Sequence, residues 1–389
     1  MISKKLIEHI KSAKTPLYFY NMQLLSQTLE QLKTASSKYG YHIHYALKAN
    51  FNSKILKEIS RIGLGADCVS GNEIEKALEN GFPAEKIVFA GVGKTNDEIL
   101  LALKNNIQAF NCESYQEIIV INDLAKKTGR KAKIYLRLNP DIIADTHKNI
   151  TTGKAENKFG LQPSETEKFL QNRDNLKNIE VEGLHFHVGS QISDMNVFKN
   201  LCFKVNKLQN DFYKKGLNIK NLNMGGGLGV DYLNPKENAI PDFQKYFDTF
   251  HNHLNLKANQ QVHFELGRSI VAQMGTLFSK VLYIKEGFQN PFVIIDASMT
   301  DLLRPALYEA FHKIENLSNT NRPKIKSIYD VAGPVCESSD VFARNISLGD
   351  TRRGDIIAIY STGAYGQVMS SSYNLRPAAS TLYSDEYLF

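Results

Sequence analysis

The sequence predicts an α/β protein that contains a (β/α)8 TIM-type barrel and a C-terminal, mostly-β domain. Between residues 43 and 268, eight short β-type runs alternate with polar segments of helical pattern. Such alternation is typical of a parallel sheet, and eight units are the number that closes a barrel. After about residue 270, strand-like segments follow one another with turn residues between them, which indicates a separate β domain.

The eight runs lie in regular order along the chain. Segments between them, such as 53–63 and 72–81, repeat apolar residues at three- and four-residue spacing and end at a glycine, as amphipathic helices do. A doubly wound open sheet is the alternative for such a pattern. The runs are IHYALKAN (43–50), ADCVS (66–70), KIVFAG (86–91), QAFNCES (108–114), KIYLRLN (133–139), VEGLHFHVGS (181–190), NLNMGGG (221–227) and VHFELGR (262–268).

Reactive or glycine-rich positions recur at the C-terminal ends of these runs. In a barrel those ends share one face, where the βα-loops build active sites, whereas an open sheet would scatter several of them along its length. The barrel is therefore favoured. The positions are Lys48, Asp67, Ser190, glycines 225–227 and Arg268.

The C-terminal part of the chain has little helical pattern apart from 303–312. The early segment TPLYFY (15–20) is strand-like and precedes the barrel. We therefore expect a barrel over residues 22–270 and a β domain over 271–389, which the strand within residues 1–21 joins. The strand-like segments of the β domain are 276–287, 291–298, 323–333 and 354–361.

Composition excludes several classes of protein. Hydrophobic residues make up 42% of the chain, with 21 Phe and 18 Tyr, so it is neither disordered nor fibrous. The formal net charge of +7 comes without a basic tract, so we expect small anionic ligands and no nucleic-acid partner. The start of the chain is charged and the apolar runs are short, so we expect no membrane partner. The four cysteines are far apart, which fits a reducing compartment and a cytoplasmic location.

Lys48 ends the first barrel run, in YALKAN. Its neighbours Ala46, Leu47 and Ala49 would partly remove it from water, which makes an amine more nucleophilic. Such a lysine suits a Schiff base with a carbonyl substrate or with pyridoxal phosphate. A surface lysine at the start of a loop is the structural alternative.

Two glycine-containing segments are candidates for a phosphate site. MGGGLG (224–229) follows a strand, and its backbone N–H groups can approach a phosphate closely. It lacks the last glycine of a dinucleotide fingerprint, because Val230 stands there. GVGKT (91–95) resembles the end of a Walker loop, but Val88 stands where that motif needs a glycine, so we expect an ordinary loop there.

HFHVGS (185–190) predicts His185 and His187 on the same face of a strand. The pair could ligate a metal, as in some barrel hydrolases, but no other run ends in a histidine, so no metal is expected. A flat imidazole can instead stack on a cofactor ring, and His185 is expected to line the barrel. In ELGR, Glu265 could hold a heteroaromatic nitrogen protonated and Arg268 could bind a carboxylate or phosphate; an ion pair is the alternative.

Cys336 stands beside Glu337 in GPVCESSD (333–340), within the predicted β domain. Its thiol could act as a nucleophile or a proton donor, and a small buried core residue is the structural alternative. The segment 363–374 offers two tyrosines among small residues, suited to hydroxyl contacts or to packing.

These segments form a specific set when they are taken in order: YALKAN, ADCVSGNE, NKFG, HFHVGSQI, GGGLG, ELGRSIV, RPALYEA, GPVCESSD and GAYGQVMSSSYNLRP. Through it the chain resembles the fold-type III pyridoxal-phosphate decarboxylases, which pair an alanine-racemase-like barrel with a C-terminal β domain. Within that group it is most similar to the diaminopimelate decarboxylases, which catalyse the last step of bacterial lysine biosynthesis. The likeness covers essentially the whole chain.

The resemblance implies roles for the matched residues. Lys48 would hold pyridoxal 5'-phosphate covalently, His187 would stack on its ring, and Asp67 would lie near it. Glu265 would pair with the pyridinium nitrogen. Cys336 would donate a proton after carbon dioxide leaves, and it would come from the partner subunit of a homodimer. The phosphate would be held by Ser190, Gly226, Gly227, the backbone of Gly267 and Arg268, and Tyr365.

Charge distinguishes the possible substrates. Ornithine, arginine and lysine end in a cation, which needs acidic residues, whereas diaminopimelate ends in an amino-acid group. The resemblance implies that Arg304, Tyr308 and Arg268 bind its distal carboxylate, with Tyr365 nearby, and that Glu337 binds its distal ammonium. The expected reaction is decarboxylation of meso-2,6-diaminopimelate to L-lysine.

Three alternatives stay open: a decarboxylase of another basic amino acid or of carboxynorspermidine, a catalytically inactive relative that binds a partner, and a metal-dependent barrel hydrolase. Two positions depart from the family pattern. Leu266 replaces the proline usual in E-P-G-R, and Ser339 replaces the glycine usual in C-E-S-G-D. Both put local loop shape in question but remove no reactive group.

Overall fold

The computed structural model describes residues 3–140, 142, 158–319, 322 and 327–387. The chain divides into two compact units. The barrel unit comprises Leu29–Gly229 and Asp242–Gly267, and the β unit comprises Met1–Thr28, Val230–Pro241 and Arg268–Phe389. The domain limits of 22–270 and 271–389 stay a prediction. They did not foresee that Val230–Pro241, in the middle of the barrel sequence, belongs to the β unit.

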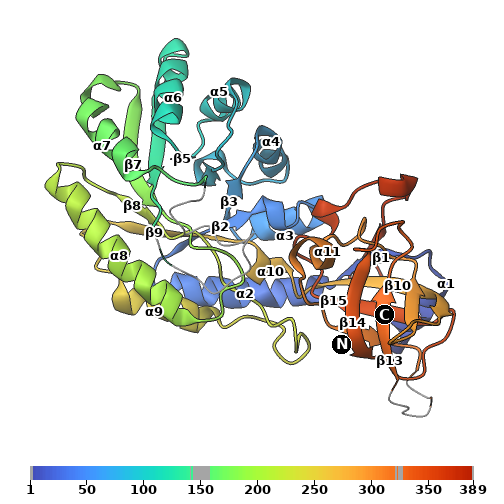
Figure 1. The fold of residues 1–389 in the computed structure, drawn as a ribbon. Coiled ribbons are helices and arrows are strands. Elements are labelled where there is room, and N and C mark those ends of the chain that lie inside the picture. Colours follow the sequence, from blue (N-terminus) through green and yellow to red (C-terminus); the bar gives the residue numbers. More distant parts are fainter. Residues whose placement is uncertain (1–2, 141, 143–157, 320–321, 323–326, 388–389) are drawn as a thin grey trace. The chain divides into compact units, whose positions relative to one another are not determined.

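Eight parallel strands close a barrel in the order in which they occur in the chain (Figure 1). The predicted barrel is thus confirmed, and the open-sheet alternative is wrong. Closure is made by β9, which pairs in parallel with β2, for example Tyr45 with Leu266. The strands are β2 (His42–Ala46), β3 (Gly65–Cys68), β4 (Ile87–Phe89), β5 (Ala109–Cys112), β6 (Ala132–Arg137), β7 (Ile179–His185), β8 (Asn221–Asn223) and β9 (Gln261–Leu266).

Helices alternate with the strands along the chain and lie outside them in Figure 1. Three of them begin at a side chain that caps the first turn: Ser70, Thr95 and Ser114 each accept a hydrogen bond from a glutamate N–H three residues later. The helices are α2 (Met22–Ser37), α3 (Ser53–Arg61), α4 (Gly71–Glu79), α5 (Asn96–Asn105), α6 (Tyr115–Lys127), α7 (Pro163–Asn172), α8 (Met195–Lys214) and α9 (Phe243–His253), with the 3₁₀ turn η1 (Leu47–Ala49) after β2.

The barrel interior has an apolar middle and polar ends. Val88, Ala109 and Tyr135 pack together as a buried cluster. Toward the N-terminal ends of the strands, His44 and His263 are buried and hydrogen-bonded to each other, with 2.9 Å between Nε2 and Nδ1. Both line a cleft of about 650 Å³. The reactive positions predicted above lie at the opposite, C-terminal ends.

The β unit contains a mixed sheet in the order β12-β15-β10-β11-β13-β14, with β1 beside β10 and β16. The predicted mostly-β domain is confirmed. Within it, β1 pairs antiparallel with β10 and parallel with β16. The strands are β1 (Leu17–Tyr20), β10 (Gly275–Lys285), β11 (Phe292–Ile295), β12 (Ile314–Asn316), β13 (Ile328–Ala332), β14 (Val341–Ser347), β15 (Ile356–Tyr360) and β16 (Ser380–Tyr383).

Short helices complete the β unit: α1 (Lys4–Ser12), α10 (Arg268–Val271) and α11 (Arg304–Tyr308). Leu6 and Ile10 of α1 belong to the buried core of this sheet, so the amphipathic N-terminal segment is an integral part of the unit. The other core residues are Leu17, Phe19, Phe278, Ile356, Ala358, Tyr360 and Leu382.

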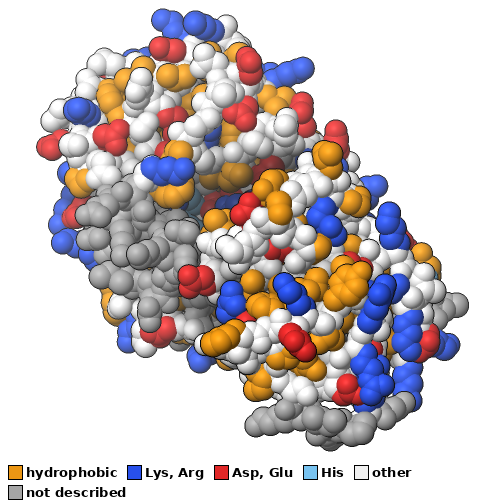
Figure 2. All heavy atoms as spheres, turned by 45° about the vertical axis from the view of Figure 1, so that its right-hand side comes forward, with side chains coloured by type: hydrophobic (Ala, Val, Ile, Leu, Met, Phe, Trp, Pro, Cys, Tyr) orange, Lys and Arg blue, Asp and Glu red, His pale blue; other side chains and the backbone are white. Residues whose placement is uncertain are grey.

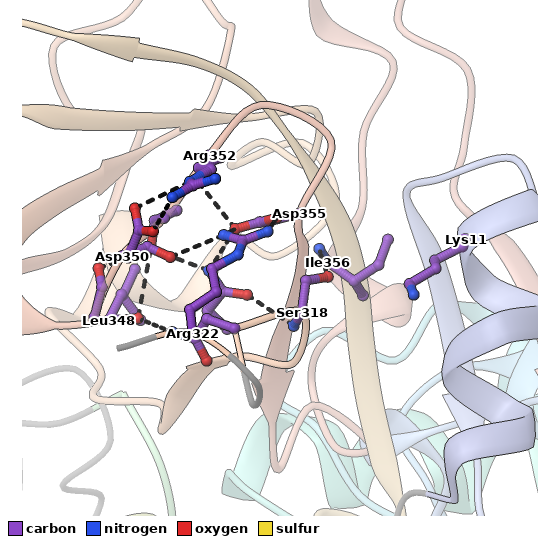
Figure 3. A network of polar contacts seen from close by, with 12 residues as sticks. Lys11, Ser318, Arg322, Leu348, Asp350, Arg352, Asp355 and Ile356 are labelled. Atoms are coloured by element: carbon purple, nitrogen blue, oxygen red, sulfur yellow. Dashed lines mark hydrogen bonds and ion pairs between the residues drawn. The ribbon is translucent and has the colours of Figure 1, made fainter. Parts of the chain in front are cut away.

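A polar network ties the loop before β15 to the segment after β12 (Figure 3). Arg322 donates two hydrogen bonds of 2.7 Å to the two carboxylate oxygens of Asp355. The backbone N–H of Arg352 donates to the same carboxylate, and the N–H of Ile356 donates to the Ser318 hydroxyl. Such a bidentate pair fixes both segments in register.

On the face drawn in Figure 2, lysine and arginine side chains are interspersed with acidic, polar and hydrophobic ones. Within the described ranges, none of the helices is both long and apolar enough to cross a membrane. The same residues contain no group of three or more histidine, cysteine or acidic side chains that could hold a metal ion.

Candidate active site

Lys48 lies in η1, directly after β2, and its amine is 3.1 Å from Oδ2 of Asp67 at the end of β3. Asp67 is buried, while the Lys48 side chain is 40% exposed. The other oxygen of Asp67, Oδ1, is buried without a hydrogen-bond partner among the described residues. An open acceptor beside an accessible amine is typical of a site that a ligand completes.

Glu265 is the second buried carboxylate, near the end of β9. It accepts hydrogen bonds from three side chains: Asn111 (2.9 Å), Asn223 (2.7 Å) and Nε2 of His185 (2.9 Å). A carboxylate offers about four acceptor positions, so Glu265 can accept one further donor. As predicted, His185 is a buried residue of the barrel. The structure shows in addition that it is hydrogen-bonded to Glu265.

Electrostatics distinguish the two carboxylates. Burial raises the pKa of Asp67, and the negative charge of Glu265 raises it further, whereas the charge and hydrogen bond of Lys48 lower it. Burial would also raise the pKa of Glu265, but the charge and hydrogen bond of His185, with the charge of Lys48, lower it below its ordinary value. Glu265 is therefore the carboxylate that stays ionised most readily.

His187 lies two residues beyond the end of β7, so the prediction that it shares a strand face with His185 is wrong. Its Nδ1 accepts a hydrogen bond of 3.3 Å from the N–H of Gly226. Burial lowers the pKa of His187, and the charges of Arg137 and Lys48 act in the same direction. The imidazole is accordingly neutral, as an acceptor of an N–H must be.

The glycine loop after β8 lies against neighbouring strands. A Cβ at Gly226 would stand 2.0 Å from the carbonyl oxygen of Glu265, and Gly227 has a φ of +112°. The loop also meets the segment that contains Ser190, because the N–H of Ile192 donates to the carbonyl of Gly227 (2.8 Å). No larger residue fits at Gly226, which explains part of the glycine run.

Gly267 is the last residue of the barrel unit. A Cβ there would come within 3.1 Å of the Cβ of Ala46 and 3.0 Å of the Cβ of Ala49, on either side of Lys48. Leu266, which departs from the family pattern, is buried in β9 and pairs with β2. The barrel unit thus gathers the predicted residues Lys48, Asp67, His187, Ser190, Gly226, Gly227, Glu265 and Gly267.

The β unit holds a second group of predicted residues. Arg268 donates a hydrogen bond of 2.7 Å to the Tyr232 hydroxyl, and its guanidinium lies 4.8 Å from the ring centre of Tyr365. Arg304, at the start of α11, lies 4.8 Å from the ring centre of Tyr232. Both guanidiniums are buried, and Tyr308 is half-buried at the end of the same helix.

Cys336 and Glu337 form a third group, exposed on the β unit. The Cys336 thiol is 3.2 Å from Nδ2 of Asn374, and the Tyr373 hydroxyl donates to Glu337 (2.7 Å). The prediction of a buried core cysteine as the alternative is therefore wrong. Ser339 is exposed, and its hydroxyl contacts the sulfur of Met299.

Sequence reasoning missed several polar partners. Asn111 and Asn223 support Glu265, and His312 contacts Arg304. Arg137 forms a buried ion pair with Glu113 at the C-terminal ends of β6 and β5. The signal for Asn111 was present as a single amide within the apolar run QAFNC.

Comparisons with known proteins agree with this geometry. A family model described as "Pyridoxal-dependent decarboxylase, pyridoxal binding domain" matches residues 25–272. Diaminopimelate decarboxylase of Bacteroides thetaiotaomicron is 49% identical over 381 residues, which cover 98% of each chain. The Aquifex aeolicus enzyme of the same name is 40% identical over 94% of this chain and 85% of its own.

A solved structure is also similar. Diaminopimelate decarboxylase from Helicobacter pylori, complexed with L-lysine, superposes with a TM-score of 0.90 at 40% identity, over 98% of this chain and 94% of the other. The likeness extends over nearly the whole length of the chain. The chain therefore belongs to the pyridoxal-dependent decarboxylases and, within them, to the diaminopimelate decarboxylase family.

Proposed function

We propose that this protein converts meso-2,6-diaminopimelate to L-lysine and carbon dioxide with pyridoxal 5'-phosphate as cofactor. One observation carries the substrate assignment. Arg304 is a buried guanidinium whose hydrogen-bonded partners are the His312 imidazole and the Tyr232 side chain, and the ion pairs among the described residues include none made by Arg304. Because buried charges in proteins are normally paired, an anionic ligand group is the natural partner of this cation.

The residues of the barrel fit the cofactor. Lys48 supplies an amine for its aldehyde, and Glu265 keeps one acceptor position for the pyridinium nitrogen. Oδ1 of Asp67 and Nδ1 of His185 are both buried without a hydrogen-bond partner among the described residues. Bound pyridoxal phosphate supplies an electron sink for the charge that remains on the α-carbon when carbon dioxide leaves.

We assign the barrel residues as follows. Lys48 holds the cofactor covalently, the neutral ring of His187 packs on one face of it, and the Glu265 carboxylate keeps its nitrogen protonated. Asp67 orients the Lys48 amine. We assign the phosphate to Ser190, Gly226, Gly227 and Gly267 of the barrel unit, together with Arg268 and Tyr365 of the β unit.

The remaining predicted residues bind and protonate the substrate. Arg304, with Arg268 and Tyr308, binds the carboxylate distant from the reacting end, and Glu337 binds the ammonium beside it. After carbon dioxide departs, the Cys336 thiol donates its proton to the α-carbon. The exposure of Cys336 and Glu337 makes them available to a second copy of the chain, so we propose a homodimer in which they complete the partner's site.

We also place the enzyme in the cytoplasm, because an exposed thiol that acts as a proton donor must stay reduced. An oxidising compartment would leave Cys336 open to disulfide exchange. The three other cysteines are buried and free.

A parallel assay tests the function. Carbon dioxide release is measured from meso-diaminopimelate, ornithine, arginine, lysine and carboxynorspermidine at equal concentration. We expect release from meso-diaminopimelate at least about 100-fold faster than from the others, since a buried cation without its anionic partner is strongly disfavoured. Preference for ornithine or carboxynorspermidine would establish the alternative reaction instead.

Lys48→Ala tests the cofactor assignment. We expect it to abolish turnover and to remove the cofactor link that borohydride reduces in the wild type. Lys57→Ala, which removes an exposed lysine of α3, is the matched control and keeps both. Turnover by Lys48→Ala would contradict the assignment.

A further inference from the structure

His312 lies between the backbone of β15 and the side chain of Arg304. Its Nε2 is 2.8 Å from Nη1 of Arg304, and its Nδ1 is 2.8 Å from the carbonyl oxygen of Tyr360. A guanidinium only donates hydrogen bonds and a carbonyl only accepts them. His312 must therefore carry its proton on Nδ1 and present the lone pair of Nε2 to Arg304. That is the neutral form of the side chain.

The surroundings maintain this form. His312 is buried, and burial lowers its pKa to about 3, with the charges of Arg304 and Arg268 acting in the same direction. The edge of the His312 ring meets the ring of Tyr232, with 5.2 Å between ring centres. Since Tyr232 also accepts a hydrogen bond from Arg268, the two side chains together set the position of both guanidiniums.

A neutral acceptor has a different effect on Arg304 from the usual carboxylate. An aspartate or glutamate would also fix the guanidinium, but it would cancel the positive charge in a region of low dielectric. An imidazole fixes one N–H direction and leaves the charge available to a ligand. His312 thus orients the Arg304 guanidinium and leaves its positive charge unneutralised.

We propose that His312 is a positioning residue that determines specificity, holding Arg304 toward the distal carboxylate of the substrate without neutralising it. This inference rests on the proposed role of Arg304. It predicts that discrimination in favour of a ligand with a distal carboxylate depends on the neutrality of residue 312, and not only on its shape.

Two small molecules isolate the distal carboxylate. L-lysine keeps that group, because decarboxylation removes only the carboxylate at the reacting end, and 1,5-diaminopentane is the same molecule without it. Their dissociation constants are measured by calorimetry on the holoenzyme. The variants are His312→Glu, which adds a negative charge, and His312→Gln, which stays neutral. His251→Glu, the same change at an exposed position of α9, is the matched control.

We expect His312→Glu to weaken L-lysine binding by about 10- to 100-fold, as for the loss of one buried charge pair, and to leave 1,5-diaminopentane binding within about threefold. The KM for meso-diaminopimelate should rise with little change in kcat. His312→Gln should recover most of the L-lysine affinity, and the control should bind both molecules as the wild type does.

Other results would overturn the proposal. Equal loss of both ligands in His312→Glu would assign His312 a purely structural role, and unchanged L-lysine binding would disprove the charge argument. If His312→Glu fails to fold, His312→Leu replaces it: loss of the acceptor should reduce the preference for L-lysine over 1,5-diaminopentane, and an unchanged preference contradicts the inference.

The failure of the proposed function has a distinct signature. If Arg304→Gln retains the wild-type preference for L-lysine, then Arg304 does not bind the distal carboxylate and that role is wrong. If Arg304→Gln loses the preference while His312→Glu keeps it, only the inference about His312 fails.

Discussion

The amine of Lys48 and the carboxylate of Asp67 lie 3.1 Å apart, at the C-terminal ends of the neighbouring strands β2 and β3. The Lys48 side chain is accessible, and that of Asp67 is buried. Only one oxygen of Asp67 takes part. The second is buried without a partner among the described residues. Burial raises the pKa of Asp67, so an ionised carboxylate is unfavourable at this place. We therefore expect the ion pair to orient the Lys48 amine and to add little to the stability of the fold.

Asp67→Asn should therefore separate activity from stability. We expect the cofactor-free variant to unfold at the same or a higher urea concentration, with a gain of up to about 1 kcal/mol, because the buried charge is removed. We expect kcat/KM to fall by about tenfold or more, since the amine loses its orienting partner. Glu58→Gln, which removes a half-buried carboxylate that also pairs with one cation, Arg61, is the control. A clearly lower unfolding midpoint for Asp67→Asn would show that the pair stabilises the fold.

Glu265 allows a second separation. Glu265→Gln keeps an oxygen for Asn111 and Asn223, and its amide can donate to His185 if that ring moves its proton to Nδ1, which has no partner among the described residues. Glu265→Ala leaves both amides unsatisfied. We expect a stability loss of about 2–4 kcal/mol for alanine and less than about 1 kcal/mol for glutamine.

At position 265, activity should depend on the negative charge of the carboxylate and not on the stability of the variant. Both variants lose the carboxylate that we assign to the cofactor nitrogen, so kcat should fall on the order of 100-fold in each. Urea unfolding and steady-state kinetics on the same preparations measure the two effects. A glutamine variant with wild-type kcat would disprove the role of the charge.

The sequence predicted the architecture well because the relevant signals are local. Eight β-type runs separated by amphipathic segments indicate a parallel sheet, and the reactive positions at the C-terminal ends of the runs favour its closure into a barrel. Each run overlaps the strand observed. The polar residues that hold the site residues in place could not be predicted from the sequence in the same way. Asn111 and Asn223 are 112 residues apart and meet only because β5 and β8 belong to one closed barrel. His312 carries no local signal at all, because its role depends on the carbonyl of Tyr360 and on the tautomer that this contact selects.

His44 should make the protein sensitive to acid. Burial lowers its pKa from 6.5 to about 4. The unfolded chain therefore takes up the proton first, so the contribution of His44 to stability is complete above pH 6.5 and is lost as the pH falls toward 4. The full difference is about 3 kcal/mol.

The comparison must be made against a variant, because other groups titrate in the same range. Glu73, whose pKa burial raises to about 7, has the opposite sign. We expect His44→Gln to lose less stability than the wild type between pH 7 and pH 4.5 in urea unfolding, while His251→Gln, at an exposed position, follows the wild type. Parallel curves for all three proteins would refute the prediction.

Cys336 should be the fast-reacting thiol of the native protein. It is the exposed cysteine, whereas burial raises the pKa of Cys68 and Cys112 well above the ordinary value and that of Cys202 to about 12. Iodoacetamide at pH 8 should modify Cys336 first, as peptide mass spectrometry can show, and activity should fall in parallel.

L-lysine should protect Cys336 from this reaction if the thiol faces the substrate site. Cys336→Ser should resist inactivation by iodoacetamide while losing most of its turnover. Modification of a buried cysteine at the same rate, or full activity after complete modification of Cys336, would contradict the assignment.

The pairing of Leu17 with Ser380 has a consequence for biosynthesis. At synthesis rates of about 5–20 residues per second, the first strand of the β unit waits on the order of 20–70 s for its last neighbour to be made. The barrel strands pair with neighbours that are translated soon after them, apart from the closure by β9. The barrel can thus assemble on the ribosome before β10, the first partner of β1, is made. The other edge of β1 stays open to association with other chains until residues 380–383 follow.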